Sequence, residues 1–380
     1  MSAARPVRVD QVLTFGVEEE FLLADARTRF SAPRADDVVG AASAALGDRV
    51  RSEFFATQLE VCTEPRLAAA DLRADLAQAR TVAGAAARRA GCLLTASGCA
   101  VLTRHPLPLT DEPRYHAVAE RLRPVLDACD SELSGCHVHL GTLDRDEVLA
   151  LSAGLRPWLP AVQAMTASSP FADGRDTGCS SWRGVAYDRW PTVGPAPVLD
   201  ATGYEQLADT MVADGTVADR AMIYWYARPC EHLPTLEVRV ADANADLRTT
   251  LLAAVLLRGL ATTLLAEARA GAGPAPQPTL QQLVRAHQQA VQHGLHGWIH
   301  DSASGGRRTT LAQRLRELAH RAEPGLRAAG DHRLAAGLLT DLFTRGTGAD
   351  RPRADFRTRR SFHDVVDGIA HRTGDTVSTV

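Results

Sequence analysis

The most telling feature of this sequence is a residue type that is missing. The chain contains no lysine, so all 42 of its basic residues are arginine. This absence excludes a phosphate-binding loop that relies on lysine, Schiff-base catalysis and a lysine-dependent kinase site, because each needs the amine of a lysine side chain. Any phosphate that binds here must be held by arginine, by backbone amides or by a metal ion.

A strong net charge, a membrane span and a signal peptide are also missing. The net charge is -3, which gives no overall positive field to attract nucleic acid. No apolar run approaches the ~18–20 residues that a membrane span needs, so we expect no membrane partner. Residues 1–8 lack the apolar core of a signal peptide, and we therefore expect a cytoplasmic protein.

Cysteine is scarce and irregularly spaced. The chain has seven cysteines, an odd number, and no two of them have the C-x-x-C spacing of many redox and zinc sites. This pattern favours reduced thiols that pack as small apolar side chains in a reducing compartment. A disulfide framework or a zinc site built from thiolates is not expected.

The length and composition are those of a globular chain. It has 380 residues, 45% of them hydrophobic and 23% charged, which suits one large α/β domain or two ordinary ones. The stretch rich in Gly and Pro at 271–278 is short and indicates a connection between helices rather than a domain boundary. We therefore predict a single catalytic domain over residues 1–380, with a strand-rich core at about 12–245 and a mostly helical part at about 246–380.

An acidic run inside an apolar stretch is the clearest local pattern. Residues 14–23 read Thr-Phe-Gly-Val-Glu-Glu-Glu-Phe-Leu-Leu, and the alternation of side chains in a strand puts Glu18 and Glu20 on one face and Glu19 on the other. Two carboxylates on one face repel each other and are costly to remove from water, unless a metal ion or a cationic ligand compensates them. A solvated acidic edge strand is the alternative that this stretch alone leaves open.

Three later stretches also carry polar residues at strand spacing, with aliphatic residues on the opposite face. The stretches are 58–62 with Glu60, 134–141 with His137 and His139, and 235–240 with Glu237 and Arg239. Structural explanations remain open, because the histidines suit hydrogen-bonded core positions and the last pair suits a cross-strand salt bridge. Residues 222–228, rich in aromatics, are predicted to form a further strand.

Together these four stretches predict an antiparallel sheet with one face on the core and the other lining a cavity. The cavity face would carry four acids, two histidines and one arginine, which are Glu18, Glu20, Glu60, His137, His139, Glu237 and Arg239. Ligand sets dominated by oxygen suit hard cations such as Mg²⁺ or Mn²⁺, and four acids exceed what one zinc ion needs. Two or more Mg²⁺ ions that bridge a polyphosphate would use them. Without lysine, Arg239 is the natural group to neutralise charge during phosphoryl transfer.

Several motifs follow one another in a characteristic order. They are Phe15-Gly-Val-Glu-Glu-Glu-Phe21, Gln58-Leu-Glu60, Gly135-Cys-His-Val-His-Leu-Gly141, Ser168-Ser-Pro-Phe171 with Gly174-Arg-Asp-Thr-Gly178, and Leu236-Glu-Val-Arg239. In this order, over about residues 14–250, the chain resembles the carboxylate–amine ligases of the glutamate–cysteine ligase type 2 family. The resemblance implies an α+β, glutamine-synthetase-like fold, in which a curved and mainly antiparallel sheet lines an active-site funnel and helices pack outside.

The resemblance also implies roles for individual residues. The Mg²⁺ or Mn²⁺ ligands that it implies in the funnel are Glu18, Glu20, Glu53, Glu60, His137 and Glu237. It implies that His139 lies near the nucleotide phosphates and that Arg239 contacts the transferred phosphate. It further implies that Arg175 and Arg183 lie in a loop that faces the substrate carboxylates. Glu53 and Glu60 are an odd number of residues apart, so Glu53 must lie before the strand proper or beyond a bulge.

The activity that the resemblance implies is an ATP-dependent ligation. Mg²⁺-ATP would phosphorylate a substrate carboxylate, and an amine would attack the acyl phosphate and expel phosphate. The small-molecule amino-acid substrates would be glutamate and cysteine, although the activity on this pair could be weak and incidental. Two other classes stay open, a metal-dependent hydrolase with a His-x-His site and a catalytically silent nucleotide-binding protein. A homodimer also stays open.

Overall fold

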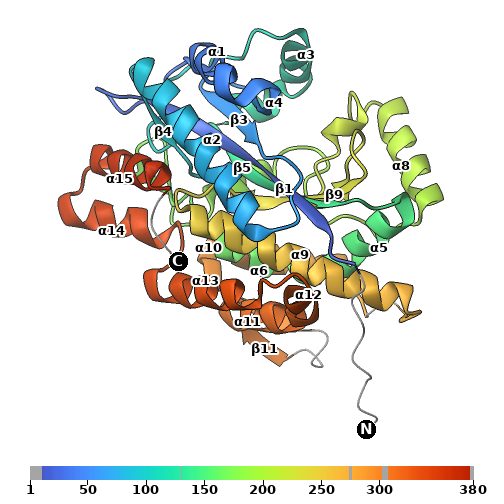
Figure 1. Ribbon diagram of the computed structural model, residues 1–380. Coiled ribbons are helices and arrows are strands. Elements are labelled where there is room, and N and C mark those ends of the chain that lie inside the picture. Colours follow the sequence, from blue (N-terminus) through green and yellow to red (C-terminus); the bar gives the residue numbers. More distant parts are fainter. Residues whose placement is uncertain (1–10, 130, 274–275, 302–306, 377–380) are drawn as a thin grey trace.

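An antiparallel sheet lies at the centre of the structure (Figure 1). The computed structural model describes residues 11–129, 131–273, 276–301 and 307–376. The sheet has seven strands in the order β2-β3-β1-β5-β9-β8, with β4 paired to β1, and neighbouring strands run antiparallel. Its strands are β1 (Thr14–Asp25), β2 (Val50–Ser52), β3 (Gln58–Cys62), β4 (Cys92–Thr95), β5 (Gly135–Gly141), β8 (Ala227–Pro229) and β9 (Thr235–Asp242). The predicted antiparallel sheet is confirmed.

The alternation of side chains along β1 separates a core face from a polar face, as predicted. Phe15, Val17 and Phe21 are at most 1% exposed and belong to the hydrophobic core. The residues between them face the other way. The strand register then aligns polar residues in cross-strand pairs, which are Glu18 with His137, Glu20 with Glu60, and His139 with Glu237. The register therefore brings residues from four distant stretches of sequence to one face of the sheet.

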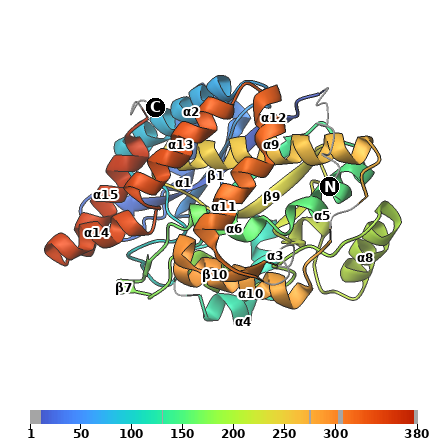
Figure 2. The same ribbon diagram turned by 90° about the horizontal axis from the view of Figure 1, so that it is seen from below.

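Helices cover the core face in two layers. The long helix α9 (Leu247–Arg269) contacts β1 and β5 directly. Beside it pack α2 (Ala69–Arg89), α5 (Arg145–Leu155) and α6 (Leu159–Thr166). The outer layer, seen from below in Figure 2, consists of α11 (Leu311–Arg321), α12 (Glu323–Ala328) and α13 (His332–Arg345), each of which contacts α9. Because α9 has neighbours on both sides, an apolar helix is favoured there over an amphipathic one.

Helix α9 is also long and apolar enough, by length and composition, to cross a membrane, which the sequence analysis did not anticipate. Within the protein, 89% of its apolar window is buried. Buried core helices pass the same test of length and composition, so this helix is weak evidence for a membrane span.

The remaining helices and strands lie around the sheet and its polar side. The helices are α1 (Ala35–Leu46), α3 (Pro113–Arg121), α4 (Arg123–Asp127), α7 (Trp182–Tyr187), α8 (Ala201–Ala213), α10 (Leu280–His293), α14 (Asp350–Arg359) and α15 (Phe362–Gly374). The short 3₁₀ helices are η1 (Gly47–Arg49), η2 (Arg220–Met222) and η3 (Gly294–His296). Two small sheets are formed by β6 (Phe171–Ala172) with β7 (Arg175–Asp176), and by β10 (Trp298–Asp301) with β11 (Arg307–Thr310).

The aromatic strand predicted at 222–228 is wrong over most of its length. Only its last two residues belong to β8. The backbone N–H groups before them bond to a neighbouring loop, because Tyr226 N donates to Gly194 O at 2.8 Å and Tyr224 N donates to Thr192 Oγ1 at 2.8 Å. The Tyr226 carbonyl still accepts a hydrogen bond from Arg239 N of β9 at 2.9 Å. The aromatic residues were interpreted as a strand signal, but one of them, Tyr224, instead lines the cavity described below.

Two sequence expectations concern residues outside the described ranges. Residues 1–8, on which the expectation about a signal peptide rests, belong to an N-terminal stretch that the structure does not describe. Residues 274 and 275 of the short Gly/Pro stretch are likewise not described. On either side of these two residues lie α9 and α10, so the stretch does connect two helices.

Candidate active site

The polar face of the sheet gathers the acids and histidines that the sequence analysis singled out. Their origins are β1 for Glu18 and Glu20, β3 for Glu60, β5 for His137 and His139, β9 for Glu237, and the turn between β2 and β3 for Glu53. Their ligand atoms form three groups, and within each group the atoms all lie within 4.8 Å of one another. Glu18 and Glu60 each belong to two groups, so the three groups form one continuous row.

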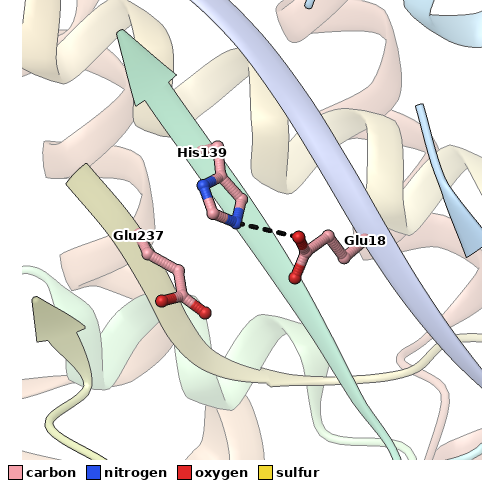
Figure 3. A group of neighbouring side chains, drawn as sticks. All are labelled: Glu18, His139 and Glu237. Atoms are coloured by element: carbon pink, nitrogen blue, oxygen red, sulfur yellow. Dashed lines mark ion pairs between the residues drawn. The ribbon is translucent and has the colours of Figure 1, made fainter. Parts of the chain in front are cut away.

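The first group consists of Glu18, His139 and Glu237, which come from three adjacent strands and point toward one another (Figure 3). His139 Nε2 lies 3.3 Å from Glu18 Oε1. The other ring nitrogen, Nδ1, lies 3.0 Å from Thr235 Oγ1, and this contact orients the ring. Two arginines flank Glu237 on its other side, Arg228 with Nε 2.8 Å from Oε2 and Arg239 with a contact to Oε1.

The second group consists of Glu18, Glu60 and His137. His137 Nδ1 lies 3.3 Å from Glu18 Oε2, while Nε2 lies 3.5 Å from Glu20 Oε1. His137 Nε2 is buried and has no hydrogen-bond partner among the described residues. A buried nitrogen without a hydrogen-bond partner costs free energy, and a bound metal ion would satisfy it.

The third group is made of carboxylates only, Glu20, Glu53 and Glu60. Glu53 precedes β3, as the strand parity required, and its Oε2 accepts a hydrogen bond from Phe54 N at 2.7 Å. This turn geometry folds the carboxylate back toward the sheet. Three acids so close together form a strongly repulsive site without a cation, and oxygen ligands of this kind suit Mg²⁺ or Mn²⁺.

The repulsion appears in the proton affinities of the acids. Burial, together with the charge of Glu20, raises the pKa of Glu53 to about 7. Burial and the neighbouring charges of Glu18, Glu53 and Glu20 raise the pKa of Glu60 well above its usual range. In the absence of a cation, this end of the row therefore holds protons that ordinary glutamates would have released.

The other end of the row behaves in the opposite way. Burial raises the pKa of Glu18, but hydrogen bonds from His137 and His139 outweigh it, so the net pKa is lowered. Burial likewise raises the pKa of Glu237, and the charges of Arg239 and Arg228 bring it below its usual range. These two carboxylates therefore remain ionised in the folded protein.

The two histidines differ as well. Burial lowers the pKa of His137, and the nearby Arg239 lowers it further, so the ring is neutral and able to bind a metal ion. Burial also lowers the pKa of His139, but the hydrogen bond and charge of Glu18 reverse the shift and raise it. A ring that favours the charged form suits a phosphate contact better than a metal contact.

A cavity of about 250 Å³ opens beside the third group. Glu20, Glu53 and Arg239 lie in its wall. An aromatic wall, which consists of Phe54, Tyr115, Tyr187, Trp190 and Tyr224, also lines it. These rings pack edge to face or tilted, with centroids 5.5 to 6.2 Å apart. A pocket lined by aromatic rings together with charged groups is a typical small-molecule site.

The two arginines expected near the substrate occupy different positions. Arg183 is 4% exposed and lines the cavity. Arg175 is exposed on β7, outside the lining of the cavity, and its guanidinium lies over the ring of Trp182 at 4.7 Å. Arg183 is therefore the member of this pair that the structure brings to the site.

Sequence reasoning missed Arg114 and Arg228, which also line the cavity, and the aromatic wall. The wall residues come from separate turns and helices, so no periodic pattern connects them. The stretch at 222–228, which was interpreted as a strand, contributes Tyr224 and Arg228 to the lining.

The model of the glutamate–cysteine ligase family 2 matches residues 14–361 of this chain. A protein of Salinispora tropica, provisionally named glutamate–cysteine ligase 2, is 39% identical over 365 residues, which cover 96% of this chain and 95% of the relative. A protein of Mycobacterium sp. (strain KMS), provisionally named glutamate–cysteine ligase 2-2, is 36% identical over 361 residues, or 95% of this chain and 98% of the relative.

Two solved structures share the fold at low sequence identity. The glutamate–cysteine ligase of Francisella tularensis in complex with AMP superposes with a TM-score of 0.72 at 11% identity, covering 97% of this chain and 90% of that one. A bifunctional glutathione synthetase from Pasteurella multocida gives a TM-score of 0.69 at 14% identity, covering 96% of this chain and 53% of that one. The expected α+β, ligase-type fold is confirmed.

Proposed function

The chain belongs to the glutamate–cysteine ligase family 2, and from this membership we propose an ATP-dependent carboxylate–amine ligase that joins two small molecules through an acyl phosphate. The observation that carries the proposal is the continuous row of three ligand groups that ends at a cavity lined by arginines and aromatic rings. The row suits metal-bound phosphates, and the cavity suits the molecules to be joined.

The residues present fit divalent metal ions. Five carboxylates and two histidines form the groups, and the raised pKa values of Glu53 and Glu60 express an acid cluster that a cation would relieve. We propose that Mg²⁺ or Mn²⁺ is held by Glu18, Glu20, Glu53, Glu60, His137 and Glu237. When bound, such ions screen the phosphate oxygens and polarise the transferred group.

The arginines next to the row supply the positive charge that a lysine would supply elsewhere. Arg239 extends from the same face of β9 as Glu237, which fixes its guanidinium beside the row. Its planar donors would grip the oxygens of the transferred phosphoryl group as charge develops on them. His139, which favours its charged form, would contact the nucleotide phosphates.

The cavity would hold the acid and the amine. Arg183 lies in its wall, and a guanidinium there would bind a carboxylate that does not react. The aromatic wall would exclude water from the acyl phosphate, which water would otherwise hydrolyse. Family membership suggests glutamate as the acid and cysteine as the amine. Arg175 lies on the exposed hairpin outside the cavity, so it would contact a substrate only during entry.

A screen with hydroxylamine tests this function. Amino acids are supplied one at a time with Mg²⁺-ATP and hydroxylamine, and both ADP and hydroxamate are measured. The proposal expects ADP release that depends on the amino acid, with hydroxamate formed in equal amount. Nucleotide binding without ADP release from any amino acid would favour the catalytically silent alternative, and turnover without ATP would favour the metal-dependent hydrolase.

Three coarser expectations accompany the ligase proposal. We propose that the chain works as one catalytic domain, since helix α9, which follows β9, packs on the sheet that carries the ligand row and is itself contacted by α11, α12 and α13. A cytoplasmic location suits an enzyme that consumes ATP and small amino acids. A homodimer remains to be tested by light scattering.

A further inference from the structure

A buried carboxylate outside the ligand row holds the loop that carries Arg183. Asp242, at the end of β9, is 2% exposed. Its Oδ2 accepts hydrogen bonds from Ser168 N at 3.0 Å and from Ser169 Oγ at 2.8 Å. Its Oδ1 accepts one from Ser181 Oγ at 2.9 Å. One carboxylate therefore joins the two ends of the loop, and it accounts for the two serines of the Ser-Ser-Pro motif.

The same two hydroxyl groups continue to the backbone around Arg183. Ser169 Oγ accepts a hydrogen bond from Arg183 N at 3.1 Å. Ser181 Oγ accepts one from Gly184 N at 3.0 Å and so caps the short helix α7, in which Arg183 lies. Each serine thus donates to Asp242 and accepts from the α7 backbone, which couples the carboxylate to the position of Arg183.

The guanidinium of Arg183 makes only long polar contacts to the described residues. Nη1 lies 3.9 Å from Asp242 Oδ1, and Nη2 donates to Arg239 O at 3.4 Å. The guanidinium carbon lies 4.9 Å from the ring centre of Tyr187. Charge-assisted hydrogen bonds are normally about 2.7–2.9 Å long, so this guanidinium keeps donors for a ligand in the cavity that it lines.

A glycine makes room for this arginine next to the ligand row. A Cβ atom at Gly135 would lie 2.5 Å from Arg183 Nη2 and 3.2 Å from His137 Nε2. The backbone N of Gly135 donates to Glu20 Oε2 at 2.5 Å. The bare backbone at the start of β5 therefore lets Arg183 lie against the strand, beside a carboxylate of the row.

We propose that Asp242 is a positioning residue that presents Arg183 to the free carboxylate of the acid substrate, acting through Ser169, Ser181 and its own negative charge. The inference rests on the proposed ligase function and goes beyond it, because Asp242 is buried and does not belong to the lining of the cavity. It also ascribes the Ser-Ser-Pro motif to substrate affinity rather than to loop stability alone.

The variant Asp242→Asn tests the inference with L-glutamate and hydroxylamine as probes. If the oxygen of the new amide keeps its hydrogen bonds to Ser168 N and Ser169 Oγ, its NH₂ group points toward Ser181 and Arg183. The Ser181 hydroxyl can then accept a hydrogen bond instead of donating one. The guanidinium of Arg183 has donors only, so it loses its contact with residue 242. Hydroxylamine carries no carboxylate, so any lost carboxylate contact concerns glutamate. We expect KM for L-glutamate to rise about tenfold, the scale of one charged hydrogen bond, while KM for Mg²⁺-ATP stays unchanged and kcat falls less than KM rises.

Two controls separate positioning from a general loss of structure. Asp331→Asn removes another buried acid that pairs with an arginine, Arg258, outside the cavity, and it should leave KM for L-glutamate unchanged. In an Arg183→Ala background, Asp242→Asn should add nothing to KM, because its effect passes through Arg183. If Asp242→Asn does not fold, Ser169→Ala replaces it and should raise KM in the same direction.

Three results would overturn the inference while the ligase function stands. They are a folded Asp242→Asn with wild-type KM for L-glutamate, an equal rise of KM for Mg²⁺-ATP, and a full additional effect in the Arg183→Ala background. A wild-type protein that forms no hydroxamate from L-glutamate and shows no calorimetric binding of it would contradict the assignment of this acid, and the inference would fall with it.

Discussion

The two faces of β1 hold the same residue type in opposite electrostatic settings. Glu19, on the core face, is 1% exposed and meets the equally buried Arg80, with Nη2–Oε1 and Nε–Oε2 distances of 2.6 and 2.9 Å. Thr250 Oγ1 donates to the same carboxylate at 2.9 Å. Glu18 and Glu20, on the polar face, instead meet histidines and further carboxylates.

This difference teaches how a strand divides structural from functional charge. On the core face Glu19 has its cation within the chain, and Arg80 also donates to the backbone carbonyls of Asn244 and Ala245 at 2.7 Å each. On the polar face the acids exceed the cations, and only a group from solution can correct the imbalance. The first arrangement ties β1 to α2, whereas we propose that the second is a binding site.

The largest effect should come from breaking the core-face pair. Arg80→Ala leaves Glu19 buried without its cation, and we expect the free energy of unfolding to fall by about 3–5 kcal/mol. Urea unfolding followed by circular dichroism measures the loss. The double variant with Glu19→Gln and Arg80→Met, which removes both charges, should recover most of it. A loss below about 1 kcal/mol in the single variant would contradict a structural role for the pair.

On the polar face, removing an arginine should cost activity rather than stability. We expect Arg239→Ala to lower hydroxamate formation by roughly 10²–10³, the usual loss for one charge-stabilising donor. The fold should survive, because Arg228 still compensates Glu237. Nucleotide affinity should change little. A well-folded variant with wild-type turnover would show that Arg239 serves only as an ion-pair partner.

Removing one carboxylate from the ligand row should raise stability, whereas breaking the core-face pair lowers it. Glu60→Gln relieves repulsion among buried carboxylates, so without metal we expect Tm to rise by a few degrees. The rise of Tm that Mg²⁺ produces in the wild type should be largely lost, since a ligand shared by two groups is gone. The exposed Glu64→Gln serves as the matched control and should change neither value. A metal-free Glu60→Gln less stable than the wild type would contradict the repulsion.

The smallest effect expected is on the pH dependence of metal binding. The pKa of Glu53 is raised to about 7 and that of Glu60 is also raised, so below this range both carboxyls hold protons that Mg²⁺ must displace. Affinity for Mg²⁺ should therefore increase from pH 6 to pH 8, with protons released on binding. Calorimetry in buffers of different ionisation enthalpy counts these protons. Affinity that is flat over this window would mean that the acids are already ionised.

The sequence predicted the polar face because a strand has a period of two. Glu18, Glu20, Glu60, His137 and Glu237 could be assigned to one face from local alternation alone, and the parity of Glu53 correctly indicated a position before β3. What local alternation cannot provide is the partner of a residue. Nothing near Glu19 in the sequence points to Arg80, which lies 61 residues further along the chain.

The cavity was the part that the sequence predicted least. Its aromatic wall joins residues as far apart as Phe54 and Tyr224, each from a turn or a short helix without periodicity. The link from Asp242 through two serines to Arg183 likewise depends on how the loop at 168–183 returns to the end of β9. Such contacts are decided by tertiary packing, and the local sequence pattern contains no signal for them.

The most direct test of the account is whether nucleotide binding depends on metal. Isothermal titration of ATP or a non-hydrolysable analogue into the wild type, with Mg²⁺ and then with excess chelator, measures it. We expect affinity to fall by at least about tenfold on chelation, and Glu18→Gln and Glu237→Gln to lose affinity in Mg²⁺ without unfolding. Equal affinity with and without chelator in the wild type would contradict the claim that the polar face of β1 is a metal–nucleotide site.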